Sequence, residues 1–381
     1  MRFYGKVSLR FDGLYEAVGG GWFSPSTFAL SRRILVCMKE FVKKQAFAAA
    51  LFVFSVTAVF CLLSFLPDVP AKSPEKHYGG VVELWNVETF EGGSGSRTAW
   101  LTRQAAAFER EHEGLFVHVT TLSAEQAAQK LKEGERFDVL CFSGSGENYL
   151  PLLRPINAAV RSNVEASGTV RGVQYALPLY CGIYALFARQ SQISPNAAAA
   201  DALGFSYTVR TGKHQYVLQP VVCGFTPYNS PLSALAAAGA KGNFAPNYSV
   251  TQYAAYQAFV EGKTAVALLG TQRDLYRLSQ RERQGRIESL AFFPLCGYTD
   301  LVQYLSVHAD APACCDCFAE FMVSEKVQNS LADISLFSVL DEAIYTDQRY
   351  AEAEKLLKNA YVPNVFFPSS LREEALKELS S

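Results

Sequence analysis

Aromatic and polar side chains in this chain could together bind a small hydroxylated molecule. Aromatic rings stack on the apolar C–H faces of such molecules, and a phenol or indole adds a polar group. The aromatic candidates are Trp85, Tyr180, Tyr228 and Tyr298. The polar candidates, which follow predicted strands, are Glu91, Ser143, Ser145, Thr271 and Gln272. The alternative at each position is ordinary core packing or a solvated loop.

Two arginines extend this chemistry to anions. Guanidinium groups form paired hydrogen bonds with carboxylates and phosphates. Arg97 and Arg273 lie close to the same predicted loops, so either could bind an anionic group of a ligand. A surface ion pair is the commoner role for such residues.

Patterns typical of catalysis and metal binding are weak. None of the five histidines has a second His or Cys at the three- or four-residue spacing of metal ligands. These histidines are His77, His112, His118, His214 and His308. The stretch 143–146 (SGSG) comes nearest to a nucleophile elbow but lacks its leading glycine. We therefore expect no enzymatic activity, no metal and no cofactor.

A cysteine cluster opens a predicted helix. Cys314 and Cys317 have CxxC spacing, with Cys315 between them, and a helix amino end lowers the pKa of a thiol. A redox pair or a metal site is one interpretation. We favour small buried thiols or a disulfide, because no second Cys or His pair lies nearby. The sequence leaves the oxidation state open.

A glycine-rich loop separates a strand from a helix within residues 81–111. The strand 81–87 is rich in β-branched and aromatic residues, and apolar residues at helical spacing follow the loop. The loop (EGGSGS, 91–96) includes Gly92 and could bind a small polar solute, cradle a nucleotide phosphate, or form a turn without a ligand. It lacks the third glycine of a dinucleotide fingerprint and the Gly-Lys-Ser/Thr of a P-loop.

Similar units follow along the chain. Strands are predicted at 115–121 and 137–142, with a helix at 124–132 between them, and the second strand also ends in a Gly/Ser loop. Alternating strands and helices with short loops favour an α/β fold with a parallel sheet. Ligands settle beyond the carboxyl ends of such strands.

The length and charge of the chain limit its possible functions. The 381 residues could hold two domains of ordinary size. With 35 basic and 36 acidic residues, the bulk charge does not indicate a nucleic-acid partner. Two charged amphipathic stretches near the carboxyl end, 350–360 and 371–380, are expected to cover a domain surface.

The amino-terminal part indicates export. Residues 45–66 carry no charge and match the length that spans a membrane. Lysines precede them, so residues after 67 are expected outside the cytoplasm. The segment could be an uncleaved anchor or a signal peptide cleaved near Ala71; lipidation at Cys61 is disfavoured by the bulky Phe60. Residues 1–44 would be a cytoplasmic or spurious extension, with translation starting at Met38, and residues 67–78 a linker.

Four stretches in the remaining chain resemble extracellular solute-binding proteins of ABC importers (family 1, carbohydrate-type). The first runs from Leu84 through Gly92 and Phe108 to Val139. The others are GVQYALPLY at 172–180, FVEGKTAVALLG at 259–270 and AEFMVSEKVQ at 319–328.

This resemblance implies a type II periplasmic-binding-protein-like fold with two lobes joined by a hinge. Residues 79–180 with 264–309 would form lobe 1, and 181–263 with 310–381 lobe 2. The expected function is capture of a sugar or oligosaccharide for delivery to ABC permease subunits. The alternative is an exported α/β enzyme or binding module for a phosphorylated metabolite or nucleotide.

Overall fold

The computed structural model describes residues 40, 45, 55, 79–90, 93–193, 205–211, 213–224, 229–239, 251–262 and 265–367. The predicted membrane segment 45–66 and linker 67–78 therefore lie outside the described residues, apart from Gln45 and Ser55. Within the described part of the chain, no helix has both the length and the apolar character needed to span a bilayer. All elements below belong to the unit Lys76–Ser381.

The first sheet has the order β2-β1-β3-β13-β4, and β7 also pairs with β13. β1 is parallel to β2 and β3, whereas β13 runs antiparallel to its neighbours. The strands are β1 Gly80–Val87, β2 Leu115–Leu122, β3 Val139–Phe142, β4 Leu153–Arg154, β7 Leu177–Cys181 and β13 Val302–His308. The predicted strands at 81–87, 115–121 and 137–142 are thus confirmed to within two residues.

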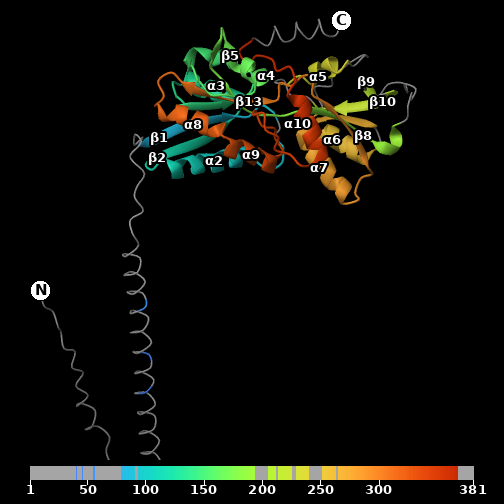
Figure 1. The fold of residues 1–381 in the computed structure, drawn as a ribbon, viewed down its shortest axis with the longest axis horizontal. Coiled ribbons are helices and arrows are strands. Elements are labelled where there is room, and N and C mark those ends of the chain that lie inside the picture. Colours follow the sequence, from blue (N-terminus) through green and yellow to red (C-terminus); the bar gives the residue numbers. More distant parts are fainter. Residues whose placement is uncertain are drawn as a thin grey trace, which may run out of the picture. The chain divides into compact units, whose positions relative to one another are not determined.

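Helices pack around this sheet through buried apolar side chains. α2 buries Trp100, Leu101, Ala105 and Phe108, and Phe108 packs edge-on against Phe318 with ring centroids 5.2 Å apart. The helices are α2 Arg97–Glu111, α3 Ala124–Lys132, α8 Cys314–Met322 and α9 Glu325–Asn329. The predicted helix 124–132 and the helix opened by the cysteine cluster are both present (Figure 1).

The second sheet has the order β12-β8-β11-β10-β9. Its strands are β8 Tyr184–Arg189, β9 Phe205–Thr211, β10 His214–Cys223, β11 Ala267–Thr271 and β12 Leu290–Leu295. Its helices α5 Pro231–Ala237, α6 Gln252–Glu261 and α7 Gln272–Arg283 lie beside it, with α10 Gln348–Leu357 near α7 (Figure 1). Shorter elements are α4 Ser162–Glu165, β5 Thr169–Val170 and β6 Val173–Gln174.

The strand pairing differs from the predicted division into lobes. The segment 264–309 was grouped with 79–180, yet β11 and β12 both pair with β8 in the second sheet. Conversely, α8 contacts β13 and α2 of the first sheet, although 310–381 was assigned to the other lobe. A buried run such as β11 has the same composition in either sheet, so the sequence could not assign it.

Two short crossover segments, 181–184 and 298–302, connect the sheets. The Gly182 N–H donates to the Leu301 carbonyl at 2.6 Å, and the Thr299 hydroxyl donates to the Gly182 carbonyl at 2.8 Å. Cys181 also exchanges two 2.9 Å backbone hydrogen bonds with Phe337, which belongs to a third segment of the chain. Several backbone segments are therefore bound together where the chain passes between the sheets.

Candidate functional site

A polar cluster lies at the carboxyl end of β1. We call it the Glu88 cluster; its members are Asn86, Glu88, Arg97 and Thr98. The Glu88 carboxylate accepts hydrogen bonds from Asn86 Nδ2 at 3.1 Å, Thr98 Oγ1 at 3.2 Å and Arg97 Nη2 at 3.0 Å. Glu88 is fixed by these donors while 29% of its side chain stays exposed. It is therefore a preorganised hydrogen-bond acceptor at the sheet edge where α/β proteins bind ligands.

Arg97 forms the buried side of this cluster. Its side chain is only 6% exposed, and its guanidinium carbon lies 4.7 Å from the centre of the Phe90 ring. Its Nη1 atom is buried without a hydrogen-bond partner. Burial raises the pKa of Tyr180 nearby, and the positive charge of Arg97 partly opposes that increase.

A second polar cluster lies on the crossover segments. We call it the Asp300 cluster; it comprises Asp300, Tyr184, Tyr298 and Ser230. The Asp300 carboxylate accepts from the Tyr184 hydroxyl at 2.6 Å, the Ser230 N–H at 2.7 Å and the Tyr298 hydroxyl at 3.4 Å. Burial, followed by the nearby Asp300 charge, raises the pKa of Tyr184 well above its usual value. Tyr184 therefore stays a neutral donor that orients the carboxylate.

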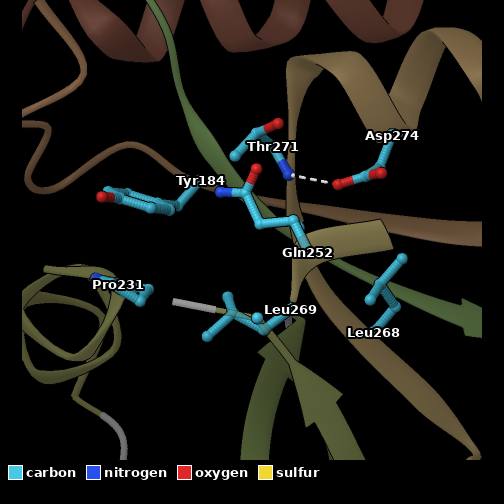
Figure 2. A pocket seen from close by; sticks show the side chains of 9 residues that line it. Tyr184, Pro231, Gln252, Leu268, Leu269, Thr271 and Asp274 are labelled. Atoms are coloured by element: carbon cyan, nitrogen blue, oxygen red, sulfur yellow. Dashed lines mark hydrogen bonds between the residues drawn. The ribbon is translucent and has the colours of Figure 1, made fainter. Parts of the chain in front are cut away.

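A hollow in the second sheet adjoins this cluster. Tyr184 and Thr271 lie along it with Gln252, and the Thr271 N–H donates to Asp274 Oδ2 at 3.0 Å (Figure 2). Its free volume is about 10 Å³, which is room for about one water molecule. Leu268 and Leu269 supply apolar lining. The hollow combines apolar walls with a few polar groups, but it is much smaller than the pockets that hold small-molecule ligands.

The predicted aromatic residues are buried in packed surroundings. Trp85 is 3% exposed and its ring centroid lies 5.5 Å from that of Phe137. Tyr180 is 3% exposed and meets Trp100 edge-on at 5.7 Å. Tyr298 is 7% exposed, but its hydroxyl belongs to the Asp300 cluster. Tyr228 lies outside the described residues.

The predicted polar residues have mainly local partners. Ser143 is buried and its carbonyl accepts from Thr89, whereas Ser145 is half-buried with a φ of 51°. Thr271 caps α7, and Gln272 is fully buried with its Oε1 accepting from the Ile183 N–H at 2.8 Å. Arg273 is half-buried beside them. Glu91 and Gly92 lie outside the described residues.

The described part of the glycine loop packs against another backbone segment. The Ser94 N–H donates to the Ile334 carbonyl at 2.8 Å, and a Cβ at Gly93 would lie 1.9 Å from that oxygen. The glycine is needed for this close approach, and the Ser94 N–H is already used. This geometry weakens the phosphate-cradle interpretation of residues 93–96.

The described cysteines are free thiols in largely buried positions. Burial raises the pKa of Cys141 to about 12 and that of Cys181 to about 11. Cys314 and Cys315 are buried, whereas Cys317 is half-buried. Among the described residues, no group of three His, Cys, Asp or Glu side chains could hold a metal ion.

Glu88, Asp300 and Tyr184 were not among the predicted site residues. Glu88 directly follows the last residue of β1, and Asp300 precedes β13 by two residues. Their position next to strand ends was the available signal, but acidic residues at strand ends are also common on solvated loops. Only the hydrogen-bond partners distinguish the two cases.

Solved structures of known proteins share this fold. The GacH receptor of Streptomyces glaucescens, solved unliganded and with acarbose, superposes with a TM-score of 0.53 at 15% identity, covering 80% of this chain and 92% of its own. The sugar-binding protein MalE from Xanthomonas citri has a TM-score of 0.54 at 14% identity, covering 79% of this chain and 95% of MalE. Thiaminase I from Bacillus thiaminolyticus has a TM-score of 0.51 at 12% identity, covering 79% of this chain and 100% of the thiaminase chain.

The comparisons establish the fold. Many of the structural neighbours are maltose- or sugar-binding proteins, all at low sequence identity. No protein-family model and no curated protein matches the sequence itself. The chain therefore has an α/β fold that resembles the two-lobed periplasmic sugar-binding proteins.

Proposed function

We propose that this protein is the solute-binding component of an ABC importer and captures a sugar or oligosaccharide outside the cytoplasm. The observation that carries the proposal is the position of the two carboxylate clusters. Glu88 lies at the strand ends of the first sheet, and Asp300 lies on a segment that crosses to the second. Each carboxylate is fixed by hydrogen bonds and can accept from ligand hydroxyls.

The proposed mechanism is capture by closure. A solute would bind first to the groups of one sheet, and the crossover segments would then bend to bring the other sheet onto it, as in other hinge-closing proteins. ATP would be hydrolysed by other subunits after docking to the permease. The uncharged segment 45–66 is proposed to direct export and to hold the protein at the membrane.

A thermal-shift screen of the full chain tests this proposal. A ligand that binds only the folded state raises the melting temperature. We expect stabilisation by maltose, maltotriose or another neutral sugar, and little change with nucleotides. Stabilisation by nucleotides alone would contradict the proposal.

An enzymatic role is the second candidate because thiaminase I, an enzyme by its name, shares the fold. The site supports this role less well. Burial raises the pKa of the described core thiols Cys141 and Cys181, which makes them poor nucleophiles. Recovery of an unchanged sugar after incubation with the protein distinguishes binding from conversion.

A further inference from the structure

The ion pair between Glu88 and Arg97 has a layered arrangement. The Glu88 side chain is 29% exposed, while that of Arg97 is 6% exposed, and their charged atoms are 3.0 Å apart. The negative group is therefore on the outside and the positive group on the inside. Within the described part of the chain, Glu88 is the carboxylate that pairs with this guanidinium.

Building on the proposed function, we infer that this pair makes the site selective for neutral hydroxylated solutes over anionic ones. A ligand that reaches the end of β1 meets the Glu88 carboxylate before it meets Arg97. A sugar hydroxyl can donate to that carboxylate, whereas a phosphate or carboxylate group is repelled by it. Glu88 is thus a specificity-determining residue.

The position of Arg97 explains why the single carboxylate of Glu88 can control the selection between neutral and anionic solutes. Its Nη1 atom is buried without a partner, so the guanidinium has an unused donor as well as a full positive charge. With Glu88 ionised, that charge is neutralised within the protein. Without the Glu88 charge, the same guanidinium would attract an anion, because buried charges need a partner.

Exchange of Glu88 for glutamine tests the inference. Calorimetric titrations of the full chain with maltose and with maltose 1-phosphate give the ratio of the two affinities. In Glu88→Gln we expect that ratio to move toward the phosphate by about tenfold or more, the equivalent of one favourable charge contact. Glu83→Gln is the matched control: Glu83 lies on β1, the change removes the same charge, and its partner His118 is exposed. It should leave the ratio unchanged.

The outcomes separate this inference from the proposed function. If the wild-type protein binds sugars but Glu88→Gln leaves the ratio unchanged, charge selection by this pair is wrong and the solute-binding proposal survives. If the wild type binds no sugar, both fail. Should Glu88→Gln not fold, Glu88→Asp supplies the test by retaining the charge on a shorter side chain. It should weaken maltose binding about tenfold at a constant ratio, the equivalent of one hydrogen bond to a charged group; unchanged maltose affinity would overturn the inference.

Discussion

At the scale of single residues, the carboxylate of Asp300 joins parts of the chain that lie far apart in sequence. It accepts from Tyr184 on β8, from Ser230 before α5 and from the neighbouring Tyr298. The hydrogen bonds from Tyr184 and Ser230 are short and therefore strong, at 2.6 and 2.7 Å. Loss of the carboxylate would leave buried donors without an acceptor, which costs more than the net value of the bonds.

We therefore expect Asp300→Ala to lower the free energy of unfolding by about 2 kcal/mol. Asp310→Ala is the matched control. The side chains of Asp310 and its partner Arg136 are 76% and 75% exposed, and their charged atoms are 3.7 Å apart. That change should stay within about 0.5 kcal/mol. Urea denaturation of both variants measures the difference, and equal losses would contradict the role given to Asp300.

The cysteines provide a second residue-scale prediction. Burial raises the pKa of Cys141 and Cys223 to about 12, so at pH 8 their thiolate fractions are very small. Cys317 is half-buried, so it is the more accessible of these thiols. Alkylation of the native protein followed by peptide mapping should label Cys317 well before Cys141 or Cys223. Early labelling of Cys141 would show that the first sheet opens readily.

At the scale of elements, close backbone contacts hold the glycine loop onto the segment before Phe337. A Cβ at Gly93 would lie 1.9 Å from the Ile334 carbonyl, so Gly93→Ala forces one backbone to move. We expect a loss of about 2 kcal/mol or more in unfolding free energy. Gly79→Ala is the control, since its nearest neighbour would be the Gly114 carbonyl at an ordinary 3.8 Å. Similar melting temperatures for the two variants would refute this packing.

The contact between α10 and α7 should depend on pH. Arg349 donates to both oxygens of Glu282, at 2.7 and 3.2 Å. Burial raises the pKa of Glu282, but hydrogen bonds from Arg349 and the Leu290 N–H, together with the nearby positive charges, outweigh it and lower the pKa below 4.5. The stabilisation is therefore complete above pH 4.5 and is lost as the pH falls through the lowered value.

Arg349→Met should accordingly lower stability by about 1 kcal/mol at pH 7. The difference from wild type should shrink as the pH falls through the lowered pKa of Glu282, because the wild-type carboxylate that Arg349 stabilises is then protonated as well. Denaturant titrations at several pH values measure this, with Arg136→Met at the exposed Asp310 pair as the control. A difference that stays constant down to pH 3 would contradict the assignment.

Local elements could be predicted from the sequence better than their assembly. The helix Ala124–Lys132 and the strand β1, with its β-branched and aromatic run, were both found from the sequence. The sheet to which β11 belongs is decided by pairing partners that are distant in sequence. The strand β11 was therefore grouped with residues 79–180, although it pairs with β8 in the second sheet. Trp85 was expected at a binding surface because an indole suits both stacking and a core. Glu88 was missed because its donors Asn86, Arg97 and Thr98 surround it only in the fold.

At the scale of the whole molecule, capture of a solute by closure requires movement at the crossover segments. Gly182 lies against the Gln272 amide, and a Cβ at that position would be 2.7 Å from Gln272 Oε1. The segments 181–184 and 298–302 are bound to each other by backbone hydrogen bonds. Paired segments of this kind can bend together while the two sheets keep their own structure, which is what hinge closure requires.

Small-angle X-ray scattering of the full chain, with and without saturating maltotriose, measures whether the protein closes on a sugar. If a neutral sugar is bound between two lobes that close on it, the radius of gyration should fall when maltotriose is added and should not change with ATP. A radius of gyration that is the same with every sugar tested, or that falls only with nucleotides, would contradict capture of a sugar by closure.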